Sequence, residues 1–239
     1  PCNQKRRSFL KSSQLAYDLA TKHGSNLHIL HLTTADEMKL FNEGDITGKK
    51  FTAEVCVHHL FFSEAAYKTH GNLIKCNPSV KSEQDRLALI DAVQKNKIDI
   101  IATDHAPHTW EEKQQPYLQA PSGLPLNQHS LLVLLDFYSK GIFSLEQIVQ
   151  KTSHNIAERF QIKDRGYIRE GGYADLVVID LSSNTLVTKE NILYHCGWSP
   201  FLDYTFPGAV RHTILNGEIA VSYTHLRAHE TREDLVCRL

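Results

Sequence analysis

The chain has 239 residues, of which 41% are hydrophobic and 22% charged, and its formal net charge at pH 7 is −1. This composition is typical of a globular protein with one large or two smaller domains. A charge so close to zero gives no electrostatic argument for nucleic acid or an anionic membrane as the partner. No apolar run approaches the roughly 20 residues that span a bilayer, and no secretory signal pattern opens the chain, so a cytoplasmic location is expected.

The cysteines also indicate a reducing compartment. They are scattered along the chain without a Cys-x-x-Cys pair, which predicts free thiols rather than a disulfide framework. The five positions are Cys2, Cys56, Cys76, Cys196 and Cys237.

The first two thirds of the chain alternate helical and extended patterns. Helical spacing of apolar residues ends at Gly24, Thr34 with Glu37 and Ser144 with Gln147 form capping-box patterns, and Ser82 precedes a further amphipathic run. Three apolar stretches lie between the helices, as in strands of a parallel sheet buried on both faces. The predicted strands are 27–31, 51–57 and 98–103, and the predicted helices are 8–23, a segment from 34, 63–69, 83–97, 129–140 and 144–152.

From Gly166 onward the pattern changes to strands punctuated by glycine, with no helix between them. The expected strands are 174–180, 209–216 and 218–221, and Asn216-Gly217 is typical of a two-residue hairpin turn. We therefore predict an α/β domain over 1–165 and a small β-domain portion over 166–221. Residues 222–239 fit neither pattern and are predicted to be a non-native tail.

Metal-ligand or substrate-binding residue types follow each predicted strand of the α/β part. These are His31, the pair His58-His59, and Asp104. Because the carboxyl ends of parallel strands share one edge, such side chains can converge on a site there. Adjacent residues of a strand point to opposite sides, so one of His58 and His59 is expected to face the site. The alternatives are histidines that are hydrogen-bonded in the core and an Asp104 that caps a loop.

Several segments resemble dihydroorotases of the amidohydrolase superfamily. They are "LHILHLTTADE", "NLIKCNPSVKS", "IATDHAPHTWEEK", "APSGLP" and "GYIREGGYADLVVID" with "PGAVRHTILNGE", and the resemblance runs from about Ser8 to Val221. It implies the C-terminal part of a (β/α)8 TIM-type barrel, strands six to eight, plus a portion of a small β-domain.

The resemblance also implies roles for individual residues. His31 would be the metal ligand that ends strand six, and Asp104 would be both a metal ligand and the catalytic general base. Asn77 and His108 would bind the dihydropyrimidine ring and its carboxylate. Ser122 and Gly123 would contact substrate, although the family more often has an aromatic residue before the glycine. Supporting roles behind the ligands would fall to His58, His59 and His105.

The activity implied is the reversible hydrolysis of (S)-dihydroorotate to N-carbamoyl-L-aspartate in pyrimidine biosynthesis, with two Zn²⁺ ions. Partners beyond this small-molecule substrate would be a second copy of the chain, as a homodimer, or aspartate carbamoyltransferase. The family's His-x-His, its bridging lysine carbamate or aspartate and one further histidine have no counterpart here, and His23 and His28 do not replace them. The chain is therefore expected to be a fragment that is inactive alone. An allantoinase or hydantoinase-type cyclic amidase, and a non-catalytic dihydroorotase-like subunit, are the alternatives.

Overall fold

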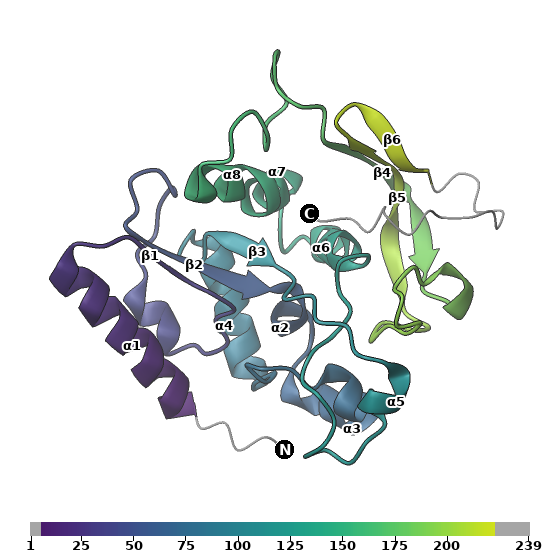
Figure 1. The fold of residues 1–239 in the computed structure, drawn as a ribbon, viewed down its shortest axis with the longest axis horizontal. Helices are drawn as coiled ribbons and strands as arrows, with labels where there is room; N and C mark the ends of the chain where they lie inside the picture. Colours follow the sequence, from purple (N-terminus) through teal and green to yellow (C-terminus); the bar gives the residue numbers. More distant parts are fainter. Residues whose placement is uncertain (1–5, 223–239) are drawn as a thin grey trace. The chain divides into compact units, whose positions relative to one another are not determined.

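A computed structural model describes residues 6–222, so residues 223–239 of the predicted tail lie outside it. Helices and strands alternate along the first part of the chain, and strands dominate the last part (Figure 1). In order, the elements are α1 (Arg6–His23), β1 (Leu27–Ile29), η1 (Glu37–Leu40), β2 (Phe51–Cys56), α2 (Val57–Phe61), η2 (Glu64–Ala66), α3 (Tyr67–His70), η3 (Gly71–Ile74), α4 (Glu83–Gln94), β3 (Ile100–Ala102), α5 (Trp110–Lys113), α6 (Ser130–Ser139), α7 (Leu145–Val149), η4 (Gln150–His154), α8 (Asn155–Phe160), β4 (Leu176–Leu186), η5 (Lys189–Asn191), β5 (Thr205–Leu215) and β6 (Glu218–Ser222).

The chain divides into two compact units. One comprises the chain through Gln128 together with Lys189–Leu202, and the other comprises His129–Thr188 and the chain from Asp203. This division differs from the predicted boundary at 165/166, since α6 packs against β5 and so groups with the strands that follow it. The domains predicted at 1–165 and 166–221 therefore remain a prediction. Among the described helices, none has the length and apolar character needed to cross a bilayer.

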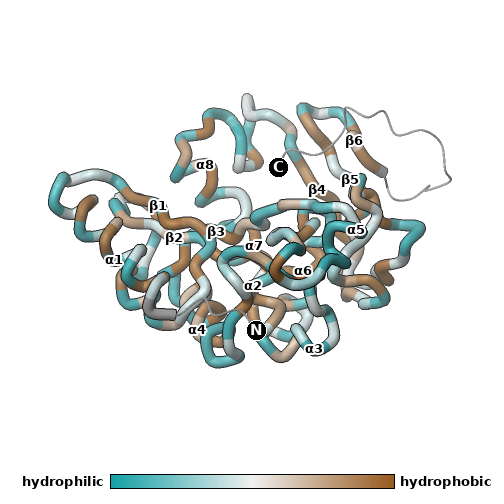
Figure 2. Tube along the Cα trace, turned by 60° about the horizontal axis from the view of Figure 1, so that its bottom comes forward, coloured by the Kyte–Doolittle hydropathy of each residue, from teal (hydrophilic) through white to brown (hydrophobic). Residues whose placement is uncertain are grey.

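The first unit is built on a parallel sheet with the strand order β1-β2-β3. The central strand β2 is the most buried, because Ala53, Val55 and Cys56 are fully inaccessible to solvent. These strands run through hydrophobic segments of the trace (Figure 2). The predicted parallel sheet is confirmed for these three strands, and their carboxyl ends share one edge.

The predicted helix boundaries of this unit hold at several positions. α1 ends directly before Gly24, whose φ of 64° favours glycine. The Ser82 hydroxyl accepts a hydrogen bond from the Asp85 amide, at 3.2 Å, and so caps α4. The buried face of α4 includes Leu89, Ile90 and Val93, whereas Leu87 is 52% exposed.

The helix expected from Thr34 is a single 3-10 turn, η1. The amide and hydroxyl of Thr34 both donate to the Glu37 carboxylate, at 3.1 and 2.8 Å, which is one half of a capping box. Glu37 also accepts from Ser13 of α1 at 2.7 Å and is only 3% exposed. The Glu37 carboxylate therefore holds the start of the segment that follows β1.

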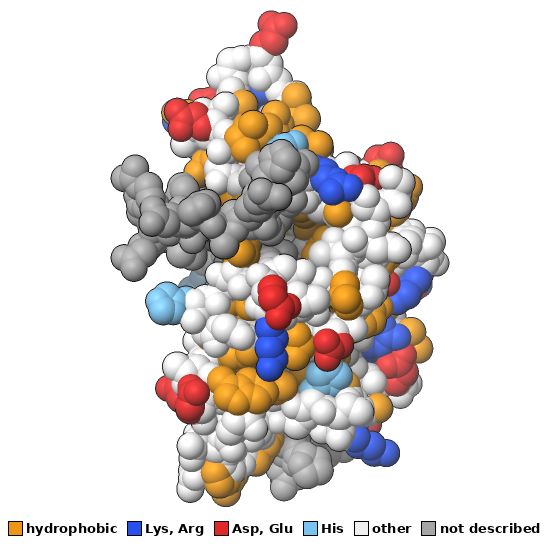
Figure 3. All heavy atoms as spheres, turned by 90° about the vertical axis from the view of Figure 1, so that its right-hand side faces the viewer, with side chains coloured by type: hydrophobic (Ala, Val, Ile, Leu, Met, Phe, Trp, Pro, Cys, Tyr) orange, Lys and Arg blue, Asp and Glu red, His pale blue; other side chains and the backbone are white. Residues whose placement is uncertain are grey.

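The second unit contains an antiparallel sheet with the order β4-β5-β6. Asn216 and Gly217, with φ values of 54° and 84°, connect β5 to β6 by the predicted two-residue hairpin turn. Ser144 and Gln147 form the predicted capping box at the start of α7. Over the face shown in Figure 3, acidic and basic side chains are interspersed rather than gathered by sign, as the near-zero net charge suggests.

Candidate active site

Two of the predicted site residues follow the outer strands of the parallel sheet. His31 comes just after β1 and Asp104 just after β3, and both adopt the left-handed backbone region, with φ values of 41° and 49°. Residues other than glycine rarely occupy this region, and such strain concentrates where a chain turns a side chain into a functional site. Neither side chain forms a hydrogen bond with any residue that the structure describes, so an imidazole and a carboxylate are available at this edge.

A buried cluster lies at the end of the central strand, between these two residues in the order of the sheet. Cys56, His58 and His59 are 0%, 1% and 3% exposed. The prediction that His58 and His59 point to opposite sides is wrong, because the chain turns into the helix α2 at Val57. Their ring centroids are only 3.9 Å apart.

His31 and Asp104 contribute to the electrostatics of this cluster. Burial lowers the pKa of His58 well below its usual value, and the charges of His59 and His31 lower it further. Burial lowers the pKa of His59 to about 3, with His31 again contributing in the same direction. Burial raises the pKa of the Cys56 thiol well above its usual value, and the carboxylate of Asp104 adds to the rise. Both predicted ligands, His31 and Asp104, therefore affect the pKa values of groups in this cluster.

The donor atoms at this edge suit a divalent cation. Both ring nitrogens of His58 and Nδ1 of His59 are buried and have no hydrogen-bond partner among the described residues. The ligand atoms of Cys56, His58 and His59 lie within 4.8 Å of one another, which makes them one group able to hold a metal ion. The thiol and imidazoles of this cluster are ligand types of Zn²⁺, and the His31 imidazole and Asp104 carboxylate at the same edge suit Zn²⁺ as well as Mn²⁺ or Co²⁺. The residue types at this edge therefore fit a divalent cation, held either by the cluster or by His31 and Asp104.

Asn77 is an exposed residue within an otherwise buried segment next to this cluster. It precedes Pro78 through a cis peptide bond, and the Pro78 carbonyl accepts a hydrogen bond from Nε2 of His59 at 2.9 Å. The buried histidine thus ties the Asn77 segment to the end of the central strand. This contact gives His59 a supporting role that adjacency in the sequence did not predict.

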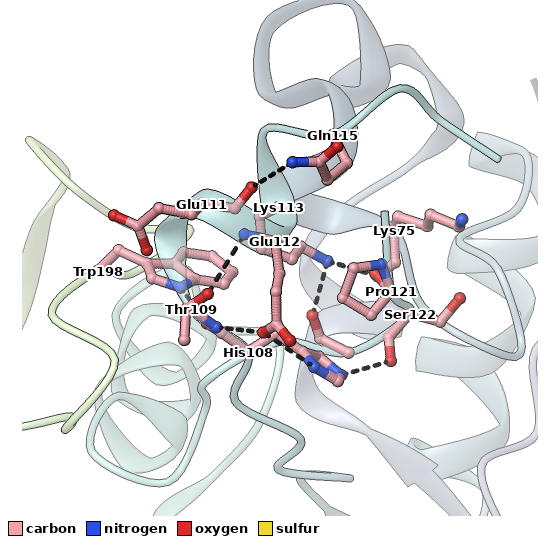
Figure 4. Close-up of polar contacts among 11 residues, drawn as sticks. Lys75, His108, Thr109, Glu111, Glu112, Lys113, Gln115, Pro121, Ser122 and Trp198 are labelled. Atoms are coloured by element: carbon pink, nitrogen blue, oxygen red, sulfur yellow. Dashed lines mark hydrogen bonds and ion pairs between the residues drawn. The ribbon is translucent and has the colours of Figure 1, made fainter. Parts of the chain in front are cut away.

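His108, Ser122 and Gly123 are brought together. Nε2 of His108 donates to the Ser122 carbonyl at 3.2 Å, and Nδ1 lies 3.7 Å from the Glu112 carboxylate (Figure 4). Gly123 has a φ of 147°, and a Cβ there would lie 2.4 Å from the carbonyl oxygen of Ala106. Glycine is therefore required for this loop to approach the segment that carries His108.

His105 has a structural role. Its Nδ1 accepts hydrogen bonds from the amides of Leu126 and Asn127, at 2.9 and 3.3 Å, so the proton of the neutral ring resides on Nε2. The ring packs against Tyr194, and burial lowers its pKa. His105 thus fixes the backbone that follows the 122–124 segment.

Sequence reasoning missed Lys113, which is the last residue of the one-turn helix α5. Its side chain is 1% exposed, and Nζ donates to the carbonyls of Lys75, Pro121 and Gly123 at 3.2, 3.0 and 2.9 Å (Figure 4). A capping-box pattern at Thr109 and Glu112 could have predicted α5, but no sequence signal indicates that its lysine points inward. The mutual arrangement of Cys56, His58 and His59 was missed for the same reason.

Comparisons with known proteins agree with the predicted resemblance. The dihydroorotase of Staphylococcus aureus strain N315 is 34% identical over 212 residues, which cover 87% of this chain and 50% of that protein. The dihydroorotase of Fusobacterium nucleatum is 34% identical over 216 residues, covering 89% of this chain and 51% of that protein. The chain spans about half the length of the curated relatives it matches.

Solved structures share the fold. The L-hydantoinase (dihydropyrimidinase) of Arthrobacter aurescens matches with a TM-score of 0.81 at 24% identity, over 89% of this chain and 48% of that one. Dihydropyrimidinase from Brevibacillus agri matches with a TM-score of 0.79 at 21% identity, over 89% of this chain and 48% of that one. The model of the amidohydrolase family matches residues 9–220. The chain belongs to the amidohydrolase family.

Proposed function

We propose that this chain supplies part of the active site of a dihydroorotase, which hydrolyses (S)-dihydroorotate reversibly to N-carbamoyl-L-aspartate. The observation that carries the proposal is the pair His31 and Asp104. Each follows an outer strand of the parallel sheet in a left-handed conformation, at the edge where the central strand ends in the cluster of Cys56, His58 and His59. The choice of dihydroorotate as the substrate rests on the dihydroorotase relatives, which are 34% identical to this chain.

In this proposal the three parallel strands correspond to strands six to eight of a (β/α)8 barrel, and the antiparallel strands to part of a small β-domain. His31 and Asp104 would hold divalent cations, taken as two Zn²⁺ ions. When bound, such ions would lower the pKa of water to about 7 and polarise a carbonyl. The remaining metal ligands would come from the half of the full-length protein that this chain does not span.

The chain's own residues would move the proton and orient the substrate. Asp104 is exposed and accepts no hydrogen bond from a described residue, so its carboxylate can take a proton from the attacking water. It would then pass this proton to the ring nitrogen that leaves. Asn77, His108 and the Ser122–Gly123 segment would bind the ring and its carboxylate, and this set favours a carboxylated dihydropyrimidine. Assembly as a homodimer or with aspartate carbamoyltransferase stays a prediction of the resemblance.

The alternative function is a hydantoinase-type cyclic amidase, because the solved structures with this fold carry hydantoinase and dihydropyrimidinase names. A substrate panel of dihydroorotate, dihydrouracil, hydantoin and allantoin separates the candidates in the full-length enzyme that carries this chain. We expect turnover of dihydroorotate at least about a hundredfold faster than of the others, which corresponds to about 2.7 kcal/mol in the transition state. A preference for hydantoin would overturn the proposal.

The general-base role has its own test. Asp104→Asn removes the proton acceptor but keeps the shape, so we expect turnover to fall by about 10³-fold or more while substrate still binds. Ser12→Ala, an exposed position of α1, is the matched control. Turnover near that of the parent in Asp104→Asn would rule out Asp104 as the base. Residues 1–221 alone, assayed for carbamoyl-aspartate cyclisation with added zinc, should show no turnover, and robust activity would contradict the need for further ligands.

A further inference from the structure

The Lys113 ammonium is enclosed by backbone carbonyls rather than paired with a carboxylate. Its three acceptors, the carbonyls of Lys75, Pro121 and Gly123, belong to two separate segments of the chain. An ammonium has three N–H donors, so each donor can serve one carbonyl. A buried charge is tolerated only when it is well solvated by such groups, and the enclosure is therefore a specific arrangement of this side chain.

Further contacts tie the same two segments together. The Gly123 amide donates to the Lys75 carbonyl at 2.9 Å. Nζ of Lys75 donates to the carbonyls of Tyr117 and Ala120, both at 2.5 Å. The loop that leads to Ser122 is thus held along its length by the segment that leads to Asn77.

The helix that carries Lys113 is fixed at its other end. Thr109 and Glu112 form a complete capping box, and the Glu112 carboxylate also faces the ring of His108. Trp198 lies beside this helix, with its ring centroid 5.8 Å from Nζ of Lys113, and its Nε1 donates to the His108 carbonyl at 2.7 Å. Lys113 is therefore attached to a rigid turn whose position is set by its contacts with His108.

We propose that Lys113 is a positioning residue, which holds the Pro121–Gly123 loop in place and thereby sets Ser122 and the ring of His108 for substrate binding. This inference deepens the proposed function and rests on it. The loop is linked to His108 through the Ser122 carbonyl, which accepts a hydrogen bond from Nε2 of His108. If the loop were released from Lys113, this carbonyl would move away from the His108 ring.

Removal of the ammonium would take away the donor to the carbonyls of Pro121 and Gly123, while the Lys75 carbonyl would keep only its hydrogen bond from the Gly123 amide. Such groups are costly to leave unpaired, so the loop would shift to reach water. Lys113→Met keeps the length of the side chain and removes the donors. In the full-length enzyme we expect KM for dihydroorotate to rise about tenfold or more with kcat within about threefold, the pattern for lost substrate positioning. Lys95→Met, which removes the exposed lysine that follows α4 and pairs with Asp91, is the control.

Unchanged KM in Lys113→Met, whatever the loss of stability, would overturn the proposal because a purely structural lysine affects folding alone. A full-length parent that hydrolyses none of the cyclic amides would contradict the proposed function instead. In that case the position of the Pro121–Gly123 loop can still be tested on this chain by a measurement that does not depend on enzymatic activity.

Hydrogen exchange of the Gly123 amide provides that readout and needs no variant. Burial lowers the pKa of Lys113 to about 8, against a rise from Cys76 and a further fall from Lys75, the titratable groups of the neighbouring segment. Glu111 and Glu112 lie on its own helix. An amine has two N–H donors, so deprotonation loosens one of the three contacts.

We expect the protection of the Gly123 amide to fall about tenfold between pH 7 and pH 9, after correction for intrinsic exchange. The Asp99 amide, bonded to the Ala53 carbonyl at 2.9 Å within the parallel sheet, should keep its protection and serves as the internal control. Equal behaviour of the two amides would overturn the proposal even if Lys113→Met failed to fold.

Discussion

Acid should destabilise this protein through His59, which is held neutral in the core. The ring is 3% exposed, and burial lowers its pKa to about 3. The unfolded chain would bind a proton near the ordinary pKa of about 6.5. Between these two values the unfolded state binds more protons than the folded state, so the free energy of unfolding falls as the pH falls.

The magnitude follows from the two pKa values. Well within this window the loss is about 1.4 kcal/mol per pH unit, so acidification from pH 7 to pH 5 costs about 2 kcal/mol through His59. That is a sizeable share of the 5–15 kcal/mol by which domains are typically stable. His58, whose pKa is also lowered by burial, acts in the same direction.

Urea denaturation at pH 5, 6 and 7 measures this loss, with the fluorescence of the buried Trp198 as the signal. His59→Gln keeps a donor for the Pro78 carbonyl and removes the titration, so its stability should depend less on pH, by about 2 kcal/mol over this range. His23→Gln, an exposed histidine at the end of α1, should leave the pH dependence as in the parent. Equal pH dependence in the parent and His59→Gln would refute the reasoning.

Two further predictions concern stability. Gly123→Ala places a Cβ 2.4 Å from the carbonyl oxygen of Ala106 at a φ of 147°, so it should lose about 1–3 kcal/mol or more in urea denaturation. Gly44→Ala, where the added Cβ meets nothing within 4 Å, is the control for backbone strain alone, and an equal loss in both would contradict the close approach. Ser82→Ala removes the cap of α4 and should cost about 1 kcal/mol, because the Asp85 amide loses its acceptor. A midpoint identical to that of Ser12→Ala would contradict the cap.

The sequence allowed the parallel sheet and the edge that carries His31 and Asp104 to be predicted, because apolar strands followed by a polar residue leave a local signal. Residues His31 and Asp104 were located this way, and β1, β2 and β3 pair in parallel as expected. The resemblance to dihydroorotases added His108 and Gly123, which the structure brings together. These features depend on few residues at short separation.

What could not be predicted depends on contacts between distant segments. The turn into α2 at Val57 changes the expected orientation of the two histidines, since adjacent side chains of a helix diverge by about 100° rather than the roughly 180° of a strand, and their ring centroids lie 3.9 Å apart. The enclosure of Lys113 requires carbonyls from 75 and from 121–123 to converge, and lysine has no pattern that distinguishes a buried from a solvated side chain. Such positions become visible only when the fold is known.

The central claim is that His31 and Asp104 bind the catalytic metal. Anomalous scattering at the zinc absorption edge, from crystals of the full-length enzyme grown with zinc, tests it most directly. The account predicts a peak within about 2.0–2.2 Å of both a His31 ring nitrogen and an Asp104 carboxylate oxygen, or two peaks that share these ligands. A zinc peak among Cys56, His58 and His59, with none beside His31 or Asp104, would contradict it.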